Sequence, residues 1–162
     1  QRRGFPPLGV LSLASYLKKY KTEVEVKVYD VFPEQQELLS ENFDIIAFSC
    51  MSIQYPDVCD YATQIRPVYK GTLVIGGVHT TLTRMLPDWA DFGIVGEGEQ
   101  TLLELVSCLM EKRPDDLTKI PGLLLHNYEK LIYTGDREIS ARITENGFAF
   151  AYQATNDEEA KI

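Results

Sequence analysis

Small and polar residues follow two apolar stretches of the sequence, residues 44–49 and 72–75. A continuous apolar run that ends abruptly in this way is typical of a buried parallel strand whose carboxyl end faces a ligand crevice. Hydroxyl and imidazole groups there can hydrogen-bond a ligand, and paired glycines let it approach the backbone because no Cβ intervenes. The candidate contact residues are Ser49, Cys50, Met51, Ser52, Gly76, Gly77, Val78 and His79. The pattern predicts a binding edge on a sheet.

Gly96, Glu97 and Gly98 form a third candidate segment, directly before an apolar helix pattern. They do not make a phosphate loop, because no GxGxxG or Walker-type pattern is present and the carboxylates would repel phosphate. Glu97 could instead accept hydrogen bonds from a neutral or amide-rich ligand. The alternative interpretation is a turn that begins the helix, with Glu99 near the positive end of the helix dipole.

The other candidates also have a purely structural interpretation. Gly76 and Gly77 can form a tight turn, and Ser52 can cap the helix that follows it. His79 has no second histidine or carboxylate at metal-ligand spacing, which disfavours a metal site. The sequence contains no Ser-His-Asp order and no GxSxG elbow, so we assign no catalytic residue and no metal ligand.

The helices and strands that alternate along the sequence must position these three candidate segments. Apolar residues at helical spacing predict helices over residues 8–20, 33–39, 57–69 and 100–112. Residues 80–90 are expected to form a helix or a pair of short turns, interrupted at Pro87. Apolar or alternating runs predict strands over residues 23–30, 44–49, 72–75 and 92–95, followed by a hairpin within residues 120–133. Together they favour an α/β fold: a flavodoxin-like (Rossmann-type) doubly wound parallel sheet with helices on both faces. The carboxyl-terminal β-hairpin would be an appendage to this sheet.

The predicted sheet lacks one strand. A domain of this type ordinarily opens with a strand, whereas this sequence passes from a proline-containing loop directly into the helix at residues 8–20. In the strand order 2-1-3-4-5, the missing strand would lie between those at 23–30 and 44–49. We expect either that the sequence begins inside the domain or that another segment fills this position. The expected domain covers residues 1–135, and residues 136–162 form a linker or tail.

Composition excludes several classes of function. The 162 residues are 44% hydrophobic and 25% charged, which suits one domain with a buried core. A formal net charge of -8 disfavours a nucleic-acid partner, and no apolar run approaches the roughly 20 residues that cross a bilayer. Because the amino terminus lacks a signal-peptide pattern, we expect a cytoplasmic protein with no membrane partner. Cys50, Cys59 and Cys108 are too widely spaced for a zinc or cluster motif, and we expect buried, reduced thiols.

Five segments together resemble the cobalamin-binding domain that precedes the catalytic barrel in cobalamin-dependent radical S-adenosylmethionine enzymes. They are Pro6–Leu17 (PPLGVLSLASYL), Asp44–Ser49 (DIIAFS), Val74–Thr81 (VIGGVHTT), Gly96–Glu99 (GEGE) and Ile120–Leu123 (IPGL). Each motif is loose, but all five occur in order and at matching spacing. The resemblance spans residues 5 to about 135.

This resemblance implies a fold that holds the corrin over the carboxyl ends of the strands, with the dimethylbenzimidazole tail inserted at the sheet edge. Residues 49–52 and 76–79 would line the tail pocket, and residues 96–98 would flank it. Cobalamin mutases and methionine synthases carry an Asp-x-His-x-x-Gly loop whose histidine ligates cobalt. The corresponding residues 1–7 contain no histidine, as is common in the radical subfamily. The CxxxCxxC motif that would bind an iron–sulfur cluster is also absent from this sequence.

The resemblance therefore implies a cobalamin-binding module of a radical S-adenosylmethionine enzyme that carries out methyl transfer or radical chemistry. The iron–sulfur cluster and S-adenosylmethionine would bind to a catalytic radical domain elsewhere in the full-length chain. The alternative is a non-catalytic α/β module that uses the same sheet edge for protein contact or for another small ligand. Receiver domains share the fold, but their acidic pair and their lysine cannot be identified here, so they rank third.

Overall fold

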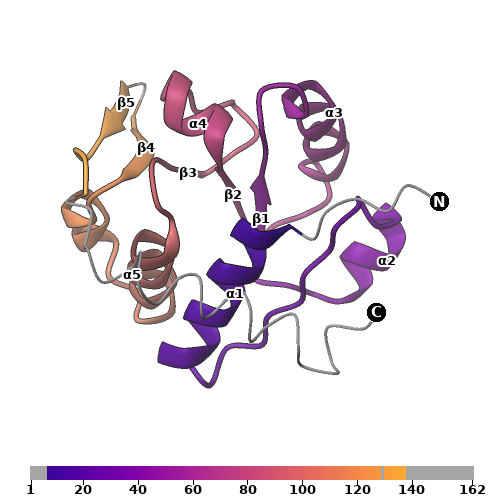
Figure 1. Ribbon diagram of the computed structural model, residues 1–162, viewed down its shortest axis with the longest axis horizontal. Helices are drawn as coiled ribbons and strands as arrows, with labels where there is room; N and C mark the ends of the chain where they lie inside the picture. The colour runs from indigo at the N-terminus through magenta and orange to yellow at the C-terminus, as the bar shows by residue number, and fades with distance from the viewer. Residues whose placement is uncertain (1–6, 129, 138–162) are drawn as a thin grey trace. The chain divides into compact units, whose positions relative to one another are not determined.

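The computed structural model describes residues 7–128 and 130–137 (Figure 1). The tail predicted over residues 136–162 therefore lies almost entirely outside the described residues. The chain divides into two compact units. The first comprises Gln1–Asp30 with Glu138–Ile162, and the second comprises Val31–Arg137.

The described part of the first unit contains helix α1 (Leu8–Tyr20), as the sequence predicts. Lys18 and Lys19 in its last turn interact favourably with the negative end of the helix dipole. The strand predicted over residues 23–30 is wrong, because these residues form no strand and the sheet does not include them. Alternating valines give this segment one apolar face, but a strand also needs a neighbour whose amide and carbonyl groups it can bond.

The second unit is built around a five-stranded sheet in the order β1-β2-β3-β4-β5. The strands are β1 (Ile45–Ser49), β2 (Thr72–Gly76), β3 (Phe92–Ile94), β4 (Leu123–Asn127) and β5 (Lys130–Tyr133). The first three are parallel neighbours, whereas β4 pairs antiparallel with β3, and β5 pairs antiparallel with β4. Three predicted strands and the predicted hairpin are thereby confirmed.

Helices precede β1 and connect the strands as far as β4, and they cover both faces of the sheet. They are α2 (Gln35–Ser40), α3 (Tyr55–Ile65), α4 (Val78–Thr83) and α5 (Glu99–Met110), and the 3-10 helix η1 (Pro114–Lys119) follows α5. In Figure 1, α3 and α4 lie above the strands and α5 lies below them. Right-handed crossovers from β1 to β2 and from β2 to β3 place α3 and α4 on one face. The flavodoxin-like fold predicted from the sequence is confirmed.

The hairpin is part of the sheet and not the appendage that the sequence suggests. Leu123 and Leu124 of β4 are 0% exposed, as are Leu73 and Ile75 of the interior strand β2. β4 pairs directly with β3, so its side chains are covered on both faces like those of a parallel strand. The three consecutive leucines of β4 therefore belong to the main core.

Helix α4 starts earlier and ends sooner than the helix, or pair of short turns, expected over residues 80–90. Arg84 ends it in the left-handed conformation, with a φ of 50°, and donates its amide hydrogen to the Thr80 carbonyl at 2.8 Å. The chain then passes through Leu86 and Trp89, which are each 8% exposed. The apolar residues that suggest a longer helix instead pack into the core from a loop.

Candidate ligand-binding site

The carboxyl ends of β1 and β2 lie side by side. Ser49 is the register partner of Gly76. Just past the strands, the Cys50 amide donates to the Gly76 carbonyl at 3.2 Å, and the His79 amide donates to the Cys50 carbonyl at 3.1 Å. The structure thus brings the two predicted segments that follow these strands together at one edge, as the parallel arrangement requires.

The two glycines at this edge have different structural roles. Gly77 has a φ of 91°, and a Cβ there would lie 2.8 Å from both the amide nitrogen and the carbonyl oxygen of Cys50. The tight-turn interpretation therefore holds for Gly77, because the backbone after β1 occupies the space of a side chain. A Cβ on Gly76 would meet nothing closer than Ile94, at 3.6 Å, which is ordinary contact. Protein packing does not require glycine at position 76.

His79 is held by two neighbours from the connection between β1 and α3. Its Nδ1 lies 3.1 Å from the Ser52 hydroxyl oxygen, and its ring stacks on Tyr55 with a centroid separation of 3.9 Å and an interplanar angle of 23°. The Nε2 atom is buried and has no hydrogen-bond partner among the described residues. The Ser52 hydroxyl therefore occupies one ring nitrogen of His79, and the other nitrogen is buried.

Tyr55 is a site residue that the sequence analysis missed. Burial raises the pKa of its phenol to about 12, and a hydrogen bond with the Cys59 side chain adds to the shift. Burial, reinforced by Cys59, likewise raises the pKa of the Cys50 thiol. These groups are uncharged at neutral pH.

All three cysteines are free, and Cys50 and Cys108 are buried as predicted, whereas Cys59 is only partly buried.

The Gly96–Gly98 segment reaches the same edge through Thr81 of α4. The Thr81 hydroxyl donates to the Gly77 carbonyl at 2.9 Å and accepts the Gly96 amide hydrogen at 3.0 Å. Gly96 has a φ of 81°, and no atom lies within 4 Å of the position of a Cβ there. All three predicted segments therefore meet, with open space at Gly96. Thr81 was not among the predicted site residues, because its role depends on contacts between distant segments.

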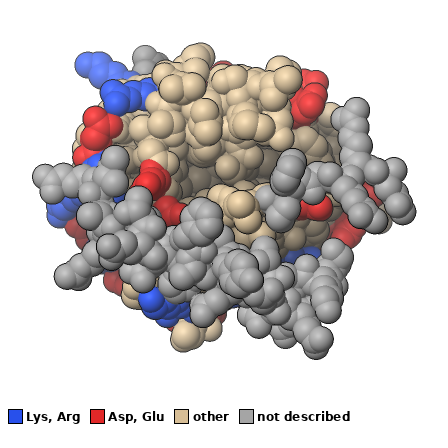
Figure 2. All heavy atoms as spheres, in the orientation of Figure 1, with Lys and Arg blue, Asp and Glu red and all other residues tan. Residues whose placement is uncertain are grey.

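Exposed apolar side chains surround this edge. They come from the connection after β1 and from α4 and its end: Met51, Ile53, Val78, Leu82 and Met85, which are 54%, 83%, 55%, 73% and 58% exposed. In the upper part of Figure 2, the surface over α4 and the β1–α3 connection carries few charged side chains. Apolar clusters on a protein surface commonly mark interaction sites. The edge therefore combines hydroxyl groups, open space at Gly96 and exposed apolar side chains.

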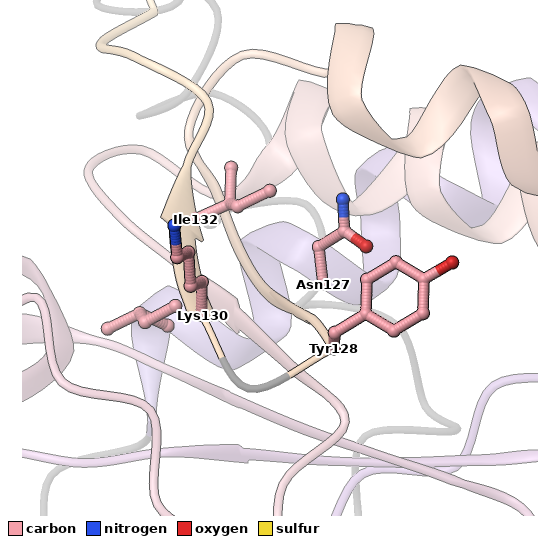
Figure 3. Close-up of a pocket in the computed structure, with 5 residues that line it drawn as sticks. Asn127, Tyr128, Lys130 and Ile132 are labelled. Carbon is pink, nitrogen blue, oxygen red and sulfur yellow. The ribbon is translucent and has the colours of Figure 1, made fainter.

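A separate hollow of about 670 Å³ lies at the hairpin and is lined by Asn127, Tyr128, Lys130, Leu131 and Ile132 (Figure 3). Because β4 runs antiparallel to β3, the turn of the hairpin lies at the amino ends of the parallel strands. Its lining residues include none of the predicted site residues. The hollow and the predicted binding edge are therefore at opposite ends of the sheet.

Two further classes of feature are absent from the described residues. Within residues 7–128 and 130–137, no helix is long and apolar enough to cross a membrane. The same part of the chain has no group of three or more His, Cys, Asp or Glu side chains that could hold a metal ion.

Comparisons with known proteins show the family and the fold of this domain. The family model of the B12 binding domain matches residues 4–106, more than half of the chain. Among solved structures, the radical S-adenosylmethionine methyltransferase TsrM from Kitasatospora setae, with cobalamin and a 4Fe-4S cluster bound, is similar in fold, with a TM-score of 0.69 and 19% identity. The match covers 88% of this chain but 28% of the TsrM chain.

A second solved structure is the amino-terminal domain of a hypothetical protein from Thermotoga maritima, with a TM-score of 0.46 and 23% identity. The match covers 66% of this chain and 89% of that one. None of the curated proteins matches the sequence.

Proposed function

The chain belongs to the B12 binding domain family, and on this premise we propose that it is the cobalamin-binding module of a radical S-adenosylmethionine enzyme. The observation that carries the proposal is the meeting of three segments, 49–52, 76–79 and 96–98, at the carboxyl edge of the sheet. Ligands of open α/β sheets bind at this edge.

The chemistry of the edge suits a corrin. A corrin is a broad apolar macrocycle with amide side chains around its rim, so it needs both apolar contact and hydrogen-bonding groups. Met51 and Val78 offer exposed apolar surface. The exposed hydroxyls of Ser49 and Ser52 can donate to or accept from amide groups. Glu97 is exposed and can accept amide hydrogens, as the sequence suggests.

The absence of a side chain at two uncrowded glycines also fits a bulky ligand. A side chain at Gly76 would meet only ordinary contacts, and one at Gly96 would meet no atom within 4 Å. Gly76, the register partner of Ser49, therefore adds no side chain at the end of β2, where one would lie against Ile94. We propose that this end of β2 receives part of the cobalamin and that Gly77, Cys50 and His79 form the wall behind it.

The cobalt would receive no ligand from His79, because one ring nitrogen lies against Ser52 and the other is buried. The residues of this chain would instead bind and orient the cofactor through its rim and tail. When bound, cobalamin supplies a cobalt centre that can carry a methyl group or take part in radical chemistry. The pKa of Cys50 is raised, so its thiol stays protonated and is a poor competing ligand.

Catalysis in this proposal requires a further domain. The chain spans 28% of the length of TsrM, so most of that protein has no counterpart here. We propose that the iron–sulfur cluster and S-adenosylmethionine bind to a catalytic radical domain of the same full-length chain. Residues 1–135 would form the cofactor domain, and residues 136–162 would lead towards the catalytic one.

Retention of the cofactor tests the proposal. The purified chain, at full length, is incubated with hydroxocobalamin and desalted, and the corrin absorbance that elutes with protein is measured. We expect stoichiometric retention by the wild type and its loss in Gly76→Val, whose added methyl groups would occupy the proposed space. Thr72→Val, at the amino end of the same strand, is the matched control and should retain the cofactor. Failure of the wild type to retain any corrin would overturn the proposal.

A non-catalytic module that uses this edge for protein contact is the second candidate. The exposure of Ile53 and Leu82, at 83% and 73%, favours it because such surface is commonly buried by a partner. The complete reading frame distinguishes the two candidates. A CxxxCxxC motif downstream supports the cobalamin enzyme, whereas a natural stop codon near Ile162 supports the contact module.

A further inference from the structure

Residues 133–137, which begin with the last residue of β5, are hydrogen-bonded along the start of β4. We call them the exit segment. The Thr134 amide donates to the Leu123 carbonyl at 3.0 Å, and the Leu123 amide donates to the Thr134 hydroxyl at 2.9 Å. The Gly122 amide donates to the Gly135 carbonyl at 2.7 Å. The exit segment is thus fixed at the carboxyl edge of the sheet, although it continues beyond the last strand.

Arg137 joins the exit segment to α5. Its Nη1 and Nη2 donate to the two carboxylate oxygens of Glu104 at 3.3 and 2.5 Å. Its Nε donates to the Thr101 hydroxyl at 3.1 Å, and Nη2 also donates to the Pro121 carbonyl at 3.3 Å. The side chains of Arg137 and Glu104 are only 21% and 33% exposed. A paired, partly buried guanidinium in this geometry holds its partners more firmly than an exposed ion pair does.

Thr101 connects Arg137 to the backbone of residues 121 and 122, which bonds the residue before Gly96. Its side chain is 0% exposed, and its hydroxyl donates to the Pro121 carbonyl at 2.9 Å. The next residue, Gly122, has a φ of 81°, and a Cβ there would lie 3.0 Å from the Thr101 hydroxyl oxygen. The Gly122 carbonyl accepts the Val95 amide hydrogen at 2.9 Å. A continuous set of bonds therefore runs from Arg137 to the residue that precedes Gly96.

A second connection reaches the same loop from α4. Arg84 at the end of α4 donates to the Asp136 carboxylate at 3.0 Å, and its guanidinium lies 4.6 Å from the centroid of the Tyr133 ring. The Tyr133 hydroxyl donates to the same carboxylate at 2.5 Å. Within α4, the Thr81 hydroxyl accepts the Gly96 amide hydrogen. The exit segment is therefore tied to both elements that hold the loop.

We propose that Arg137 is a positioning residue for the ligand-binding loop Gly96–Gly98. It holds Thr101 and Pro121, which fix Gly122, and Gly122 in turn fixes Val95 at the start of the loop. The position of the exit segment is thereby coupled to the binding edge. A displacement of the chain that follows the hairpin loosens the loop. The ligand part of this inference rests on the proposed cobalamin function, whereas the coupling between the exit segment and the loop does not.

Hydrogen exchange of Arg137→Gln tests the coupling, with Arg113→Gln as the matched control. Arg113 also forms ion pairs, with Glu111 and Asp116, but at the far end of α5. We expect the amides of Val95, Gly96 and Gly122 to exchange about tenfold faster in Arg137→Gln, because the lost hydrogen bonds involve a charged group. Amides of α3 should be unchanged in both variants, which separates the effect from a general loss of stability.

Two further measurements complete the test. Arg137→Lys keeps the charge but not the paired geometry, so faster exchange at Gly96 in this variant supports the inference even if Arg137→Gln does not fold. The dissociation constant for hydroxocobalamin should rise about tenfold in Arg137→Gln and stay unchanged in Arg113→Gln. If only residues 134–137 exchange faster, while Val95 and Gly96 keep the wild-type rate, the coupling is refuted. If the wild type binds no cobalamin, the proposed function fails, and the exchange rates still decide the coupling.

Discussion

Gly77 and Cys50 approach so closely that a Cβ on Gly77 would lie 2.8 Å from the Cys50 amide nitrogen. This approach joins the ends of β1 and β2, and the His79 amide, in the first turn of α4, donates to the Cys50 carbonyl. The relation between these two residues therefore fixes the backbone at the point where the two strands reach the proposed binding edge.

Gly77→Ala should be strongly destabilising. The substitution adds both a backbone clash and a side chain at a φ of 91°, and we expect it to lower the free energy of unfolding by about 2–4 kcal/mol. Gly76→Ala, which makes ordinary contact only, should cost less than about 1 kcal/mol. Denaturant unfolding of both variants measures the difference. Equal stability of the two would contradict the assignment of separate roles to these glycines.

The stability of the protein should fall as the pH rises from about 10 to about 12, partly because of Tyr55. The pKa of its phenol rises from the ordinary value of 10.0 to about 12 in the folded chain, so the folded state holds a proton that the unfolded state has already released. The stability that Tyr55 contributes is therefore fully present below its unfolded-state pKa of 10.0, and it is lost as the pH rises through its folded-state pKa of about 12. Tyr69, whose pKa burial raises to about 12, acts in the same direction.

Tyr55→Phe isolates this contribution, because it removes the ionisable group and keeps the ring. Its alkaline loss of stability should be shallower than that of the wild type when unfolding is followed across this pH range. Tyr128→Phe is the control, since Tyr128 is 97% exposed. If the free energy of unfolding falls with pH equally steeply in the wild type and in Tyr55→Phe, burial does not raise the pKa of the Tyr55 phenol.

Leu124→Ala should destabilise the protein by about 2–5 kcal/mol, because the side chain is 0% exposed and its removal leaves a cavity in the core. Leu131→Ala on the neighbouring strand of the hairpin should cost less than about 1 kcal/mol, since Leu131 is 44% exposed. Thermal or denaturant unfolding distinguishes the two. A small effect of Leu124→Ala would mean that the hairpin is an appendage after all.

His79→Phe should leave the visible spectrum of bound hydroxocobalamin unchanged. The ring nitrogens of His79 are engaged by Ser52 or buried, so the histidine supplies no ligand whose loss the cobalt would register. Phenylalanine keeps the stacking on Tyr55 but loses the bond to Ser52, so we expect affinity to fall about two- to tenfold. A changed spectrum of the bound cofactor would contradict this assignment and would indicate cobalt ligation by His79.

The sequence predicts which segments meet at the proposed binding edge where the reason is local to a strand. Ser49 and Gly76 end two apolar runs, and parallel pairing brings such ends together without any further information. Gly96 follows a third strand and reaches the same edge for the same reason. A single run of apolar residues is enough to identify each of these positions as the end of a strand.

Long-range partners could not be predicted in the same way. Tyr55, Thr81 and Arg137 act through residues 24, 15 and 36 positions away, and nothing in their immediate sequence marks these partners. The strand expected at residues 23–30 was wrong for a related reason. Alternation shows which face of a segment is apolar, but not whether a neighbouring strand is there to pair with it.

The most direct test of the binding edge is a map of amide chemical shifts in the labelled protein during titration with hydroxocobalamin. We predict that the largest changes occur at residues 49–52, 76–79 and 96–98, at the carboxyl edge of the sheet. Residues 127 and 130–132 of the hairpin hollow, at the opposite end, should be unaffected. No change at saturating cofactor, or changes confined to the hairpin, would contradict the central claim that this edge binds cobalamin.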